Sequence, residues 1–157
     1  MKITEIGEVQ SAEDGFAIQL KEEYREALTG IEGFSYLDII WWANLTDTPD
    51  YRGILITDKP YKKGPEKLGI FATRSQIRPN PIAVTPVYVL SVNRDTGTVY
   101  TPYIDAEIGT PVLDIKPYHP CTDIVQNVSV PSWCEHWPKS VEESGEFNWE
   151  AEFNFPA

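Results

Sequence analysis

Short apolar stretches separated by turn-forming residues run along most of the chain. Residues 3–11 and 16–20 predict two strands joined by a Glu13-Asp14-Gly15 turn. Residues 34–43 are rich in β-branched and aromatic side chains and, apart from Ser35 and Asp38, too continuously apolar for a half-exposed strand, which predicts a buried central strand. Further strands are expected at residues 68–73, 82–92, 98–104 and 112–116. Pro86 places the second of these at a sheet edge or a bulge, because proline cannot donate to a central ladder.

The end of the chain alternates aromatic and polar residues over nine positions. Phe147, Trp149, Ala151, Phe153 and Phe155 predict a strand with one buried face. Helical structure is expected only at residues 21–28 and for one turn at 132–137, and residues 46–67 predict a long functional loop containing a brief strand. We therefore expect a mainly β fold, a compact and mostly antiparallel β-barrel with short helices, because closure removes exposed sheet edges.

Composition narrows the class of protein. The 157 residues, 41% hydrophobic and 24% charged, fit one globular domain. The net charge of −11 weighs against a broad phosphate-binding surface. Two cysteines are too few for a disulfide scaffold, and neither a signal segment nor an apolar run of ~20 residues is evident, so we expect a soluble cytoplasmic protein.

Two stretches carry candidate chemistry. In residues 69–82, Arg74 and Arg78 offer planar donor forks that suit a carboxylate or a phosphate, and the Pro79-Asn80-Pro81 run restricts the backbone. Two surface arginines in a proline-rich turn explain the same residues equally well. In residues 104–118, a Gly109-Thr110-Pro111 turn precedes a strand on which Asp114 and Lys116 share a face. An internal ion pair is the simpler explanation of that second pattern.

Together these stretches resemble the signature of the TsaA-like family, which includes the TrmO-type bacterial tRNA methyltransferases. Ile6-Gly7, Phe16-Ala17-Ile18 and residues 30–35 also resemble family positions. The resemblance covers residues 3–118 and leaves residues 119–157 as a C-terminal extension of a single domain spanning residues 1–157. The longer bacterial members carry a further C-terminal domain that we do not expect here.

The resemblance implies a β-barrel that forms a homodimer, binds S-adenosylmethionine and transfers its methyl group. The implied acceptor is N6 of threonylcarbamoyladenosine in tRNA. The positions that match cofactor contacts are Gln19, Leu20, Asn44, Leu45, Arg74, Val84, Asp105, Ala106, Glu107 and Ile108. Within this set, Arg74 suits the cofactor carboxylate, and Asp105 or Glu107 suits its ribose or ammonium group. Arg78 and Asn80 are the substrate-binding candidates, and Asp114, Lys116 and Tyr118 are the catalytic candidates.

The chain departs from the family pattern at several positions. Many relatives carry His where this chain has Tyr36 and Asn44, Gly where it has Ala83, and Asp where it has Ile108. These changes and the acidic charge keep two alternatives open. One is methylation of a small metabolite, and the other is a module that senses S-adenosylmethionine without transferring its methyl group.

The remaining patterns favour structural explanations. His119-Pro120-Cys121 and Cys134-Glu135-His136 have a one-residue spacing that is unusual for zinc, so we predict no metal site. The Trp41-Trp42 pair, with Trp133 and Trp137, could stack a base, but packing is the stronger expectation. Lysines 59, 62, 63 and 67 form the one basic cluster, which could meet an acidic substrate or be solvated surface.

Overall fold

The structure, a computed structural model, describes residues 2–154 and divides the chain into two compact units. The first unit comprises residues up to 48 together with residues 80–124. The second comprises residues 49–79 together with the chain from residue 125 onward. The single-domain expectation remains a prediction, and each unit is described separately.

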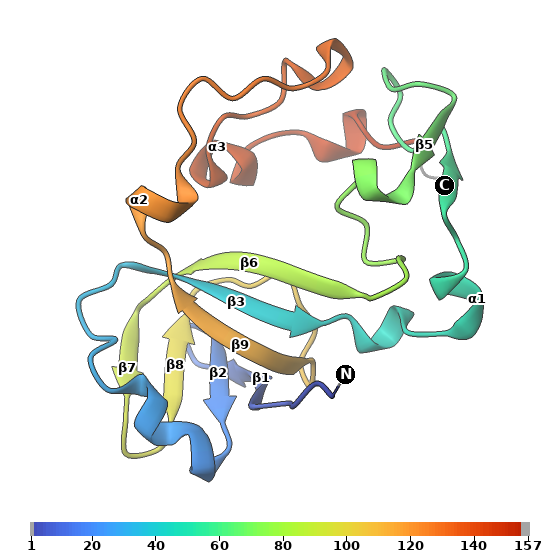
Figure 1. Ribbon diagram of the computed structural model, residues 1–157. Coiled ribbons are helices and arrows are strands. Elements are labelled where there is room, and N and C mark those ends of the chain that lie inside the picture. Colours follow the sequence, from blue (N-terminus) through green and yellow to red (C-terminus); the bar gives the residue numbers. More distant parts are fainter. Residues whose placement is uncertain (1, 155–157) are drawn as a thin grey trace. The chain divides into compact units, whose positions relative to one another are not determined.

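The first unit is built on a seven-stranded antiparallel sheet in the order β6-β3-β9-β1-β2-β8-β7 (Figure 1). Its strands are β1 (Gly7–Ala12), β2 (Gly15–Leu20), β3 (Tyr36–Trp42), β6 (Ile82–Tyr88), β7 (Ser91–Asn93), β8 (Thr98–Thr101) and β9 (Pro111–Pro117). These strands confirm a mainly β, antiparallel fold.

The central strand β3 alternates strictly between buried and half-buried side chains. Leu37, Ile39 and Trp41 point into a core that also holds Val9 and Ile18. Trp41 satisfies its indole N–H by donating to the Thr85 hydroxyl at 3.0 Å. The strand predicted at residues 34–43 is therefore present as β3, with one fully buried face and one half-buried face.

The edge strands β6 and β7 follow each other along the chain, separated by two residues. A sheet whose two edges are joined so closely must curl strongly, but its strand pairing stays open between β6 and β7. Closure into a barrel is therefore not confirmed. The edge position of β6 agrees with the prediction from Pro86, which lies in the middle of that strand.

Helices of the first unit are short. Residues 21–28 form a 3-10 helix, η1 (Glu22–Leu28), which buries Leu28 in the core. The others are η2 (Asn44–Thr46) and α2 (Pro120–Asp123). Among residues 2–154, no helix is both long enough and apolar enough to cross a membrane.

The second unit contains a two-stranded antiparallel hairpin of β4 (Ile56–Asp58) and β5 (Lys67–Gly69). Its helical segments are α1 (Pro49–Arg52), η3 (Ile70–Ala72), η4 (Ser132–Cys134), α3 (Val141–Gly145) and η5 (Trp149–Ala151). The predicted strand at residues 68–73 is wrong beyond Gly69, because η3 ends it.

The prediction of a C-terminal strand is also wrong for the residues that the structure describes. Residues 149–151 form η5, capped by the Asn148 side chain, which accepts from the Ala151 backbone N–H at 3.2 Å. Only Phe153 makes an isolated bridge, to Tyr61, and Phe155 lies outside the described residues. Phe153 packs on Tyr61, Trp149 packs on Phe153, and Phe147 packs on Trp149. The alternating aromatic side chains thus form a connected cluster of rings and not one face of a strand.

Candidate functional site

One end of the β6–β3–β9 part of the sheet gathers most of the predicted cofactor residues of the first unit. In the register, Trp42 pairs with Ile82, and Trp41 pairs with Val112 of β9. The turn after β3, the start of β6 and the loop before β9 therefore lie at the same end. This end carries Asn44, Leu45, Asn80, Val84 and the 105–108 loop.

Side chains at this end are open to solvent. Leu45 is 70% exposed, and Val84 on the outer face of β6 is 41% exposed. The Ala43 N–H donates to the Pro81 carbonyl at 2.8 Å, which fastens the turn after β3 to the start of β6. An exposed apolar rim beside fixed backbone suits a flat, partly apolar ligand such as a nucleoside.

The 105–108 loop is anchored at both sides. Ile104 is buried before it, and after it Gly109 adopts a φ of 85° and donates its N–H to the Val9 carbonyl at 2.7 Å. Ala106 packs on the core, whereas Ile108 is 63% exposed. Partial burial of the Asp105 carboxyl raises its pKa. The loop thus offers a fixed backbone and one partly desolvated carboxyl.

Gln19 and Leu20 are not available to a ligand in the same way. Leu20 is a core residue with 3% exposure. The Gln19 amide donates to the Thr96 carbonyl at 2.7 Å and accepts from the Thr98 hydroxyl at 2.9 Å, so it ties β2 to the turn before β8. The Leu20 backbone is also engaged, since its N–H donates to the Gly97 carbonyl at 2.8 Å and its carbonyl accepts from the Gln19 amide at 3.1 Å. The cofactor contacts of Gln19 and Leu20 stay predictions.

The outer face of β3 and β9 holds the catalytic candidates. Asp114 and Lys116 form an ion pair at 2.7 Å, and the Asp114 carboxylate also accepts from the Ile115 N–H at 3.0 Å. The hydrogen bond that Lys116 donates to the Asp114 carboxylate raises the pKa of Lys116, which keeps this ammonium protonated. Tyr118 lies edge-on to Tyr36 with ring centroids 6.4 Å apart.

Asp38 is a candidate that the sequence prediction did not include. It lies on the half-buried face of β3 and pairs across the ladder with Lys116. Burial, followed by the nearby charge of Asp123, raises the pKa of Asp38. Its sequence signal is a lone carboxylate inside the apolar run of residues 37–43. Partly buried acids with raised pKa values are frequent at functional sites.

The arginine-bearing stretch of the second unit is organised by its own hydroxyl groups. The buried Thr73 hydroxyl donates to the Ile70 carbonyl at 2.8 Å and accepts from the Ser75 N–H at 3.2 Å. The Ser75 hydroxyl accepts from the Ile77 N–H at 3.1 Å. We call residues 73–78 the arginine loop.

Arg78 contributes to the same loop. Its guanidinium donates to the Ser75 carbonyl at 3.1 Å and to the Thr73 carbonyl at 3.4 Å. Arg78 therefore ties the loop together. Arg74 is solvent-exposed.

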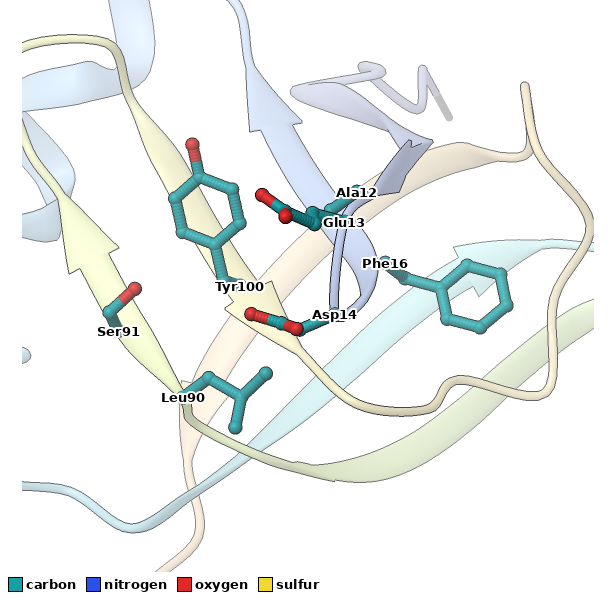
Figure 2. Close-up of a pocket in the computed structure, with 7 residues that line it drawn as sticks. All are labelled: Ala12, Glu13, Asp14, Phe16, Leu90, Ser91 and Tyr100. Atoms are coloured by element: carbon teal, nitrogen blue, oxygen red, sulfur yellow. The ribbon is translucent and has the colours of Figure 1, made fainter.

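Two surface depressions of the first unit are lined by other residues than the predicted site residues. One is lined by Arg25, Glu26, Arg94 and Asp95. Figure 2 shows the second, where Glu13 and Asp14 of the β1–β2 turn lie beside Tyr100. The cofactor candidates Asn44, Leu45, Val84 and residues 105–108 lie at the open sheet end described above, whereas Lys116 and Tyr118 lie toward the opposite end of β3.

The two His/Cys couples lie in different units. His119 and Cys121 belong to the first unit, with the Cys121 Sγ 3.1 Å from the His119 Nδ1, and Cys134 and His136 belong to the second. Within residues 2–154, no group of three or more His, Cys, Asp or Glu side chains has a metal-binding arrangement. Trp133 and Trp137 pack on Tyr61, as the packing expectation anticipated.

Comparison with known proteins identifies the family. Residues 7–124 match the family described as tRNA-methyltransferase O N-terminal domain. A probable S-adenosyl-L-methionine-binding protein of Pyrococcus horikoshii is 40% identical over 118 residues, which cover 73% of this chain and 80% of that protein. The tRNA (adenine(37)-N6)-methyltransferase of Escherichia coli is 33% identical over 125 residues, which cover 78% of this chain and 52% of that enzyme.

Structural comparison agrees. A crystal structure of TrmO from Pseudomonas aeruginosa superposes with a TM-score of 0.63 at 25% sequence identity, covering 84% of this chain and 61% of that one. The chain thus spans about half of the Escherichia coli enzyme and less than two thirds of the solved chain. With three quarters of its residues inside the matched region, the chain belongs to the tRNA-methyltransferase O N-terminal domain family.

Proposed function

We propose that this protein is an S-adenosylmethionine-dependent methyltransferase whose acceptor is N6 of threonylcarbamoyladenosine in tRNA. The observation that carries the proposal is the family match over residues 7–124, which contains both signature stretches. We further propose that it acts as a homodimer, as the family resemblance implies. The methyltransferases of Escherichia coli and mouse in the same comparison are named for adenine-37 of tRNA.

The proposed cofactor has chemical groups that the candidate residues can recognise. Arg74 supplies a guanidinium for the carboxylate, because arginine forms bidentate, charge-assisted bonds with carboxylates. Asp105 supplies an acceptor for ribose hydroxyls or the ammonium group. The backbone of the 105–108 loop and the exposed rim at Leu45 and Val84 suit the adenine.

Methyl transfer requires one bond to form and one to break. The acceptor N6 attacks the methyl carbon in line, the S–CH₃ bond breaks and S-adenosylhomocysteine leaves with the electron pair. The N6 proton must pass to a base. Asp38 suits this task best, because its raised pKa makes the carboxylate a stronger base than an ordinary aspartate. Lys116, held protonated by Asp114, suits charge stabilisation instead.

Positive charge is concentrated in one stretch of the acidic chain. Residues 49–79 hold seven of the chain's 13 Lys and Arg residues but only three of its 24 acidic residues. The arginine loop lies within this stretch, which we call the basic segment. Its exposed Arg74 is the residue that we propose binds an anionic group of the ligand.

The decisive experiment incubates the protein with radiolabelled S-adenosylmethionine and tRNA that carries unmethylated threonylcarbamoyladenosine. Nucleoside mass spectrometry should detect the N6-methylated product. Arg74→Ala should weaken cofactor binding in calorimetry by about 10- to 100-fold, because a charge-assisted hydrogen bond contributes about 1.5–3 kcal/mol. Arg94→Ala removes the same charge far from the signature and should bind like the wild type. Label transfer to a metabolite extract alone would reject the tRNA acceptor.

A non-catalytic sensor is the second candidate function. It is favoured by Ile108, which is exposed where the family resemblance predicts a carboxylate. The Pyrococcus horikoshii relative, described as a probable S-adenosyl-L-methionine-binding protein, also favours it. Micromolar binding of S-adenosylmethionine without label transfer to tRNA or to metabolites would establish this alternative.

A further inference from the structure

The β4–β5 hairpin is too small to be stable by itself. Each strand has three residues, and the two strands pair only with each other. Isolated two-stranded hairpins are marginally stable in water and need packing against another element. The hairpin leads through η3 into the arginine loop, so whatever supports the hairpin also supports Arg74.

That support comes from residues 125–154, which we call the C-terminal segment. Tyr61 lies in the turn of the hairpin and is buried. Its ring stacks on Trp133 at 5.1 Å, meets Trp137 edge-on at 5.0 Å and lies 5.7 Å from Phe153. Aromatic pairs at these separations stabilise more than their buried area alone. The C-terminal segment therefore supplies the hydrophobic core on which the hairpin turn packs.

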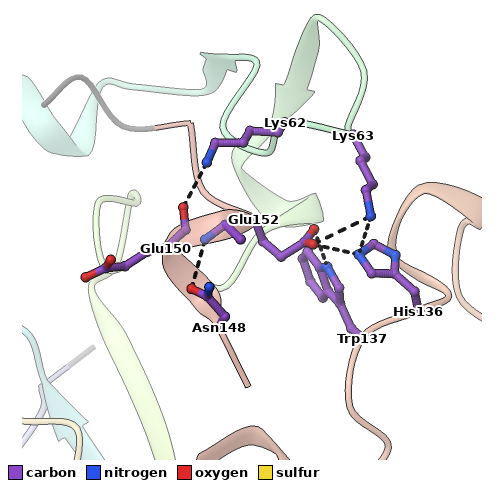
Figure 3. A network of polar contacts seen from close by, with 8 residues as sticks. Lys62, Lys63, His136, Trp137, Asn148, Glu150 and Glu152 are labelled. Carbon is purple, nitrogen blue, oxygen red and sulfur yellow. Dashed lines mark hydrogen bonds and ion pairs between the residues drawn. The ribbon is translucent and has the colours of Figure 1, made fainter. Parts of the chain in front are cut away.

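A buried carboxylate adds a polar anchor to this core (Figure 3). The Glu152 side chain is 7% exposed and accepts from the His136 Nε2 at 2.8 Å and from the Trp137 indole at 3.2 Å. Lys63 from the hairpin turn reaches both Glu152, at 3.7 Å, and His136, at 3.2 Å. The neighbouring Lys62 donates its ammonium to the Glu150 carbonyl at 2.9 Å, and its backbone N–H donates to the Glu152 carbonyl at 2.8 Å.

The charges of the two segments are complementary. The C-terminal segment carries six glutamates and a single lysine, against the excess of Lys and Arg in the basic segment. Of the four clustered lysines, Lys62 and Lys63 bind the C-terminal segment and Lys59 pairs with Glu66 at 2.6 Å. The lysine cluster is thus mainly an anchor for the rest of the second unit.

We propose that the C-terminal segment is an intramolecular clamp, with Glu152 as its positioning residue, that holds the arginine loop ready to bind S-adenosylmethionine. This rests on the proposed function for the ligand, while the clamp itself rests on contacts within the second unit. The family match ends at residue 124, so the clamp lies outside the matched region. The C-terminal segment thereby determines how tightly the arginine loop, which lies inside the matched region, binds S-adenosylmethionine.

The test compares Glu152→Gln with Glu150→Gln in the full chain. Both remove one negative charge, but Glu150 is exposed and contributes only its backbone carbonyl to Lys62. In hydrogen exchange, Glu152→Gln should speed exchange of residues 59–78 by about tenfold or more, as expected for losing a charge-assisted hydrogen bond, without changing exchange of β3. Glu150→Gln should match the wild type.

Measurements with S-adenosylmethionine distinguish a positioning role of Glu152 from a purely stabilising one. Glu152→Gln should raise the Kd and KM for S-adenosylmethionine by at most the factor seen in exchange, while kcat at saturating cofactor stays near the wild-type value. Unchanged exchange in residues 59–78 would overturn the clamp. Faster exchange with unchanged Kd and KM would overturn its role in cofactor binding.

A second variant keeps the clamp testable if Glu152→Gln does not fold. Lys63→Met removes the ammonium of the hairpin turn from Glu152 and leaves the hydrogen bonds of His136 and Trp137 to the Glu152 carboxylate in place. It should give smaller changes in the same peptides, and wild-type exchange there would overturn the clamp. If the wild type binds no S-adenosylmethionine, the proposed function fails, and the exchange comparison still decides whether the clamp exists.

Discussion

Thr73→Val removes one hydroxyl from the arginine loop and keeps the shape of the side chain. Thr73 is 9% exposed, and its hydroxyl makes two hydrogen bonds, to the Ile70 carbonyl and from the Ser75 N–H. Each contributes about 0.5–1.5 kcal/mol net, so the ordered loop should lose about 1–3 kcal/mol relative to its open state. The substitution leaves both backbone partners in a site where water has little access.

Hydrogen exchange measures this loss directly. The amide of Ser75 loses its acceptor, so its exchange and that of Ile77 should accelerate by about 5- to 100-fold, since 1.4 kcal/mol corresponds to a factor of ten. The Kd for S-adenosylmethionine should rise by at most the same factor, because the apparent Kd scales inversely with the fraction of protein whose loop is competent to bind.

Thr57→Val is the matched control. It makes the same change in β4 of the same hairpin, at a hydroxyl that has no hydrogen-bond partner within residues 2–154. An unchanged exchange rate at Ser75 in Thr73→Val would refute the argument that this hydroxyl orders the loop. A Kd raised by more than the exchange factor would instead mean that Thr73 touches the ligand.

Three further predictions test other parts of the structure. Gly7→Ala should lower the free energy of unfolding, measured by thermal unfolding, by about 1–3 kcal/mol, because the added Cβ would lie 2.2 Å from the Gln19 carbonyl oxygen. The control Gly145→Ala, at an open helical position, should be neutral or slightly stabilising. The hydrogen bond from His136 lowers the pKa of Glu152. The contribution of the Glu152 carboxylate to the free energy of unfolding should therefore be complete above the ordinary glutamate pKa of about 4.3, and it should be lost as the pH falls through the lowered pKa. In the wild type, where Lys63 and His136 face the carboxylate, tryptophan fluorescence should change over this acid range, whereas Glu152→Gln should show no such change. Asp38→Asn should lower kcat far more than it changes the Kd for the cofactor, and an equal loss in both would contradict its role as the base.

The sheet could be predicted from the sequence because its signals are local. The apolar run of residues 34–43, the Glu13-Asp14-Gly15 turn and Pro86 each indicated an element that the structure contains. The strand pairing could not be predicted in the same way, since β1 pairs with β9 across about a hundred residues. The aromatic alternation at the end of the chain misled because period two also occurs where the rings of a non-strand segment pack on one another.

Some residues of the candidate site could be predicted from the sequence and others could not, again because only local signals can be read from it. Residue type and motif indicated Arg74 and the 105–108 loop, and the register placed that loop beside Asn44 and Val84. Motif reasoning could not show that Arg78 ties the loop together, because that depends on which carbonyls its guanidinium reaches. Asp38 was missed because only the ladder shows that it faces Lys116 and not the core.

Two sets of interactions, one within the arginine loop and one with residues distant in the sequence, hold the Arg74 side chain in place. The hydroxyls of Thr73 and Ser75 fix the loop over a few residues, and their strength is independent of the rest of the chain. They cannot fix where the loop stands, because the hairpin before it lacks a third strand. Tyr61 and Lys63 provide that support by joining the hairpin to residues more than 70 positions later. Thr73→Val and Glu152→Gln should therefore weaken cofactor binding independently, and their combined effect in a double-mutant cycle should be close to additive, whereas strong coupling would mean that the loop and the clamp order together.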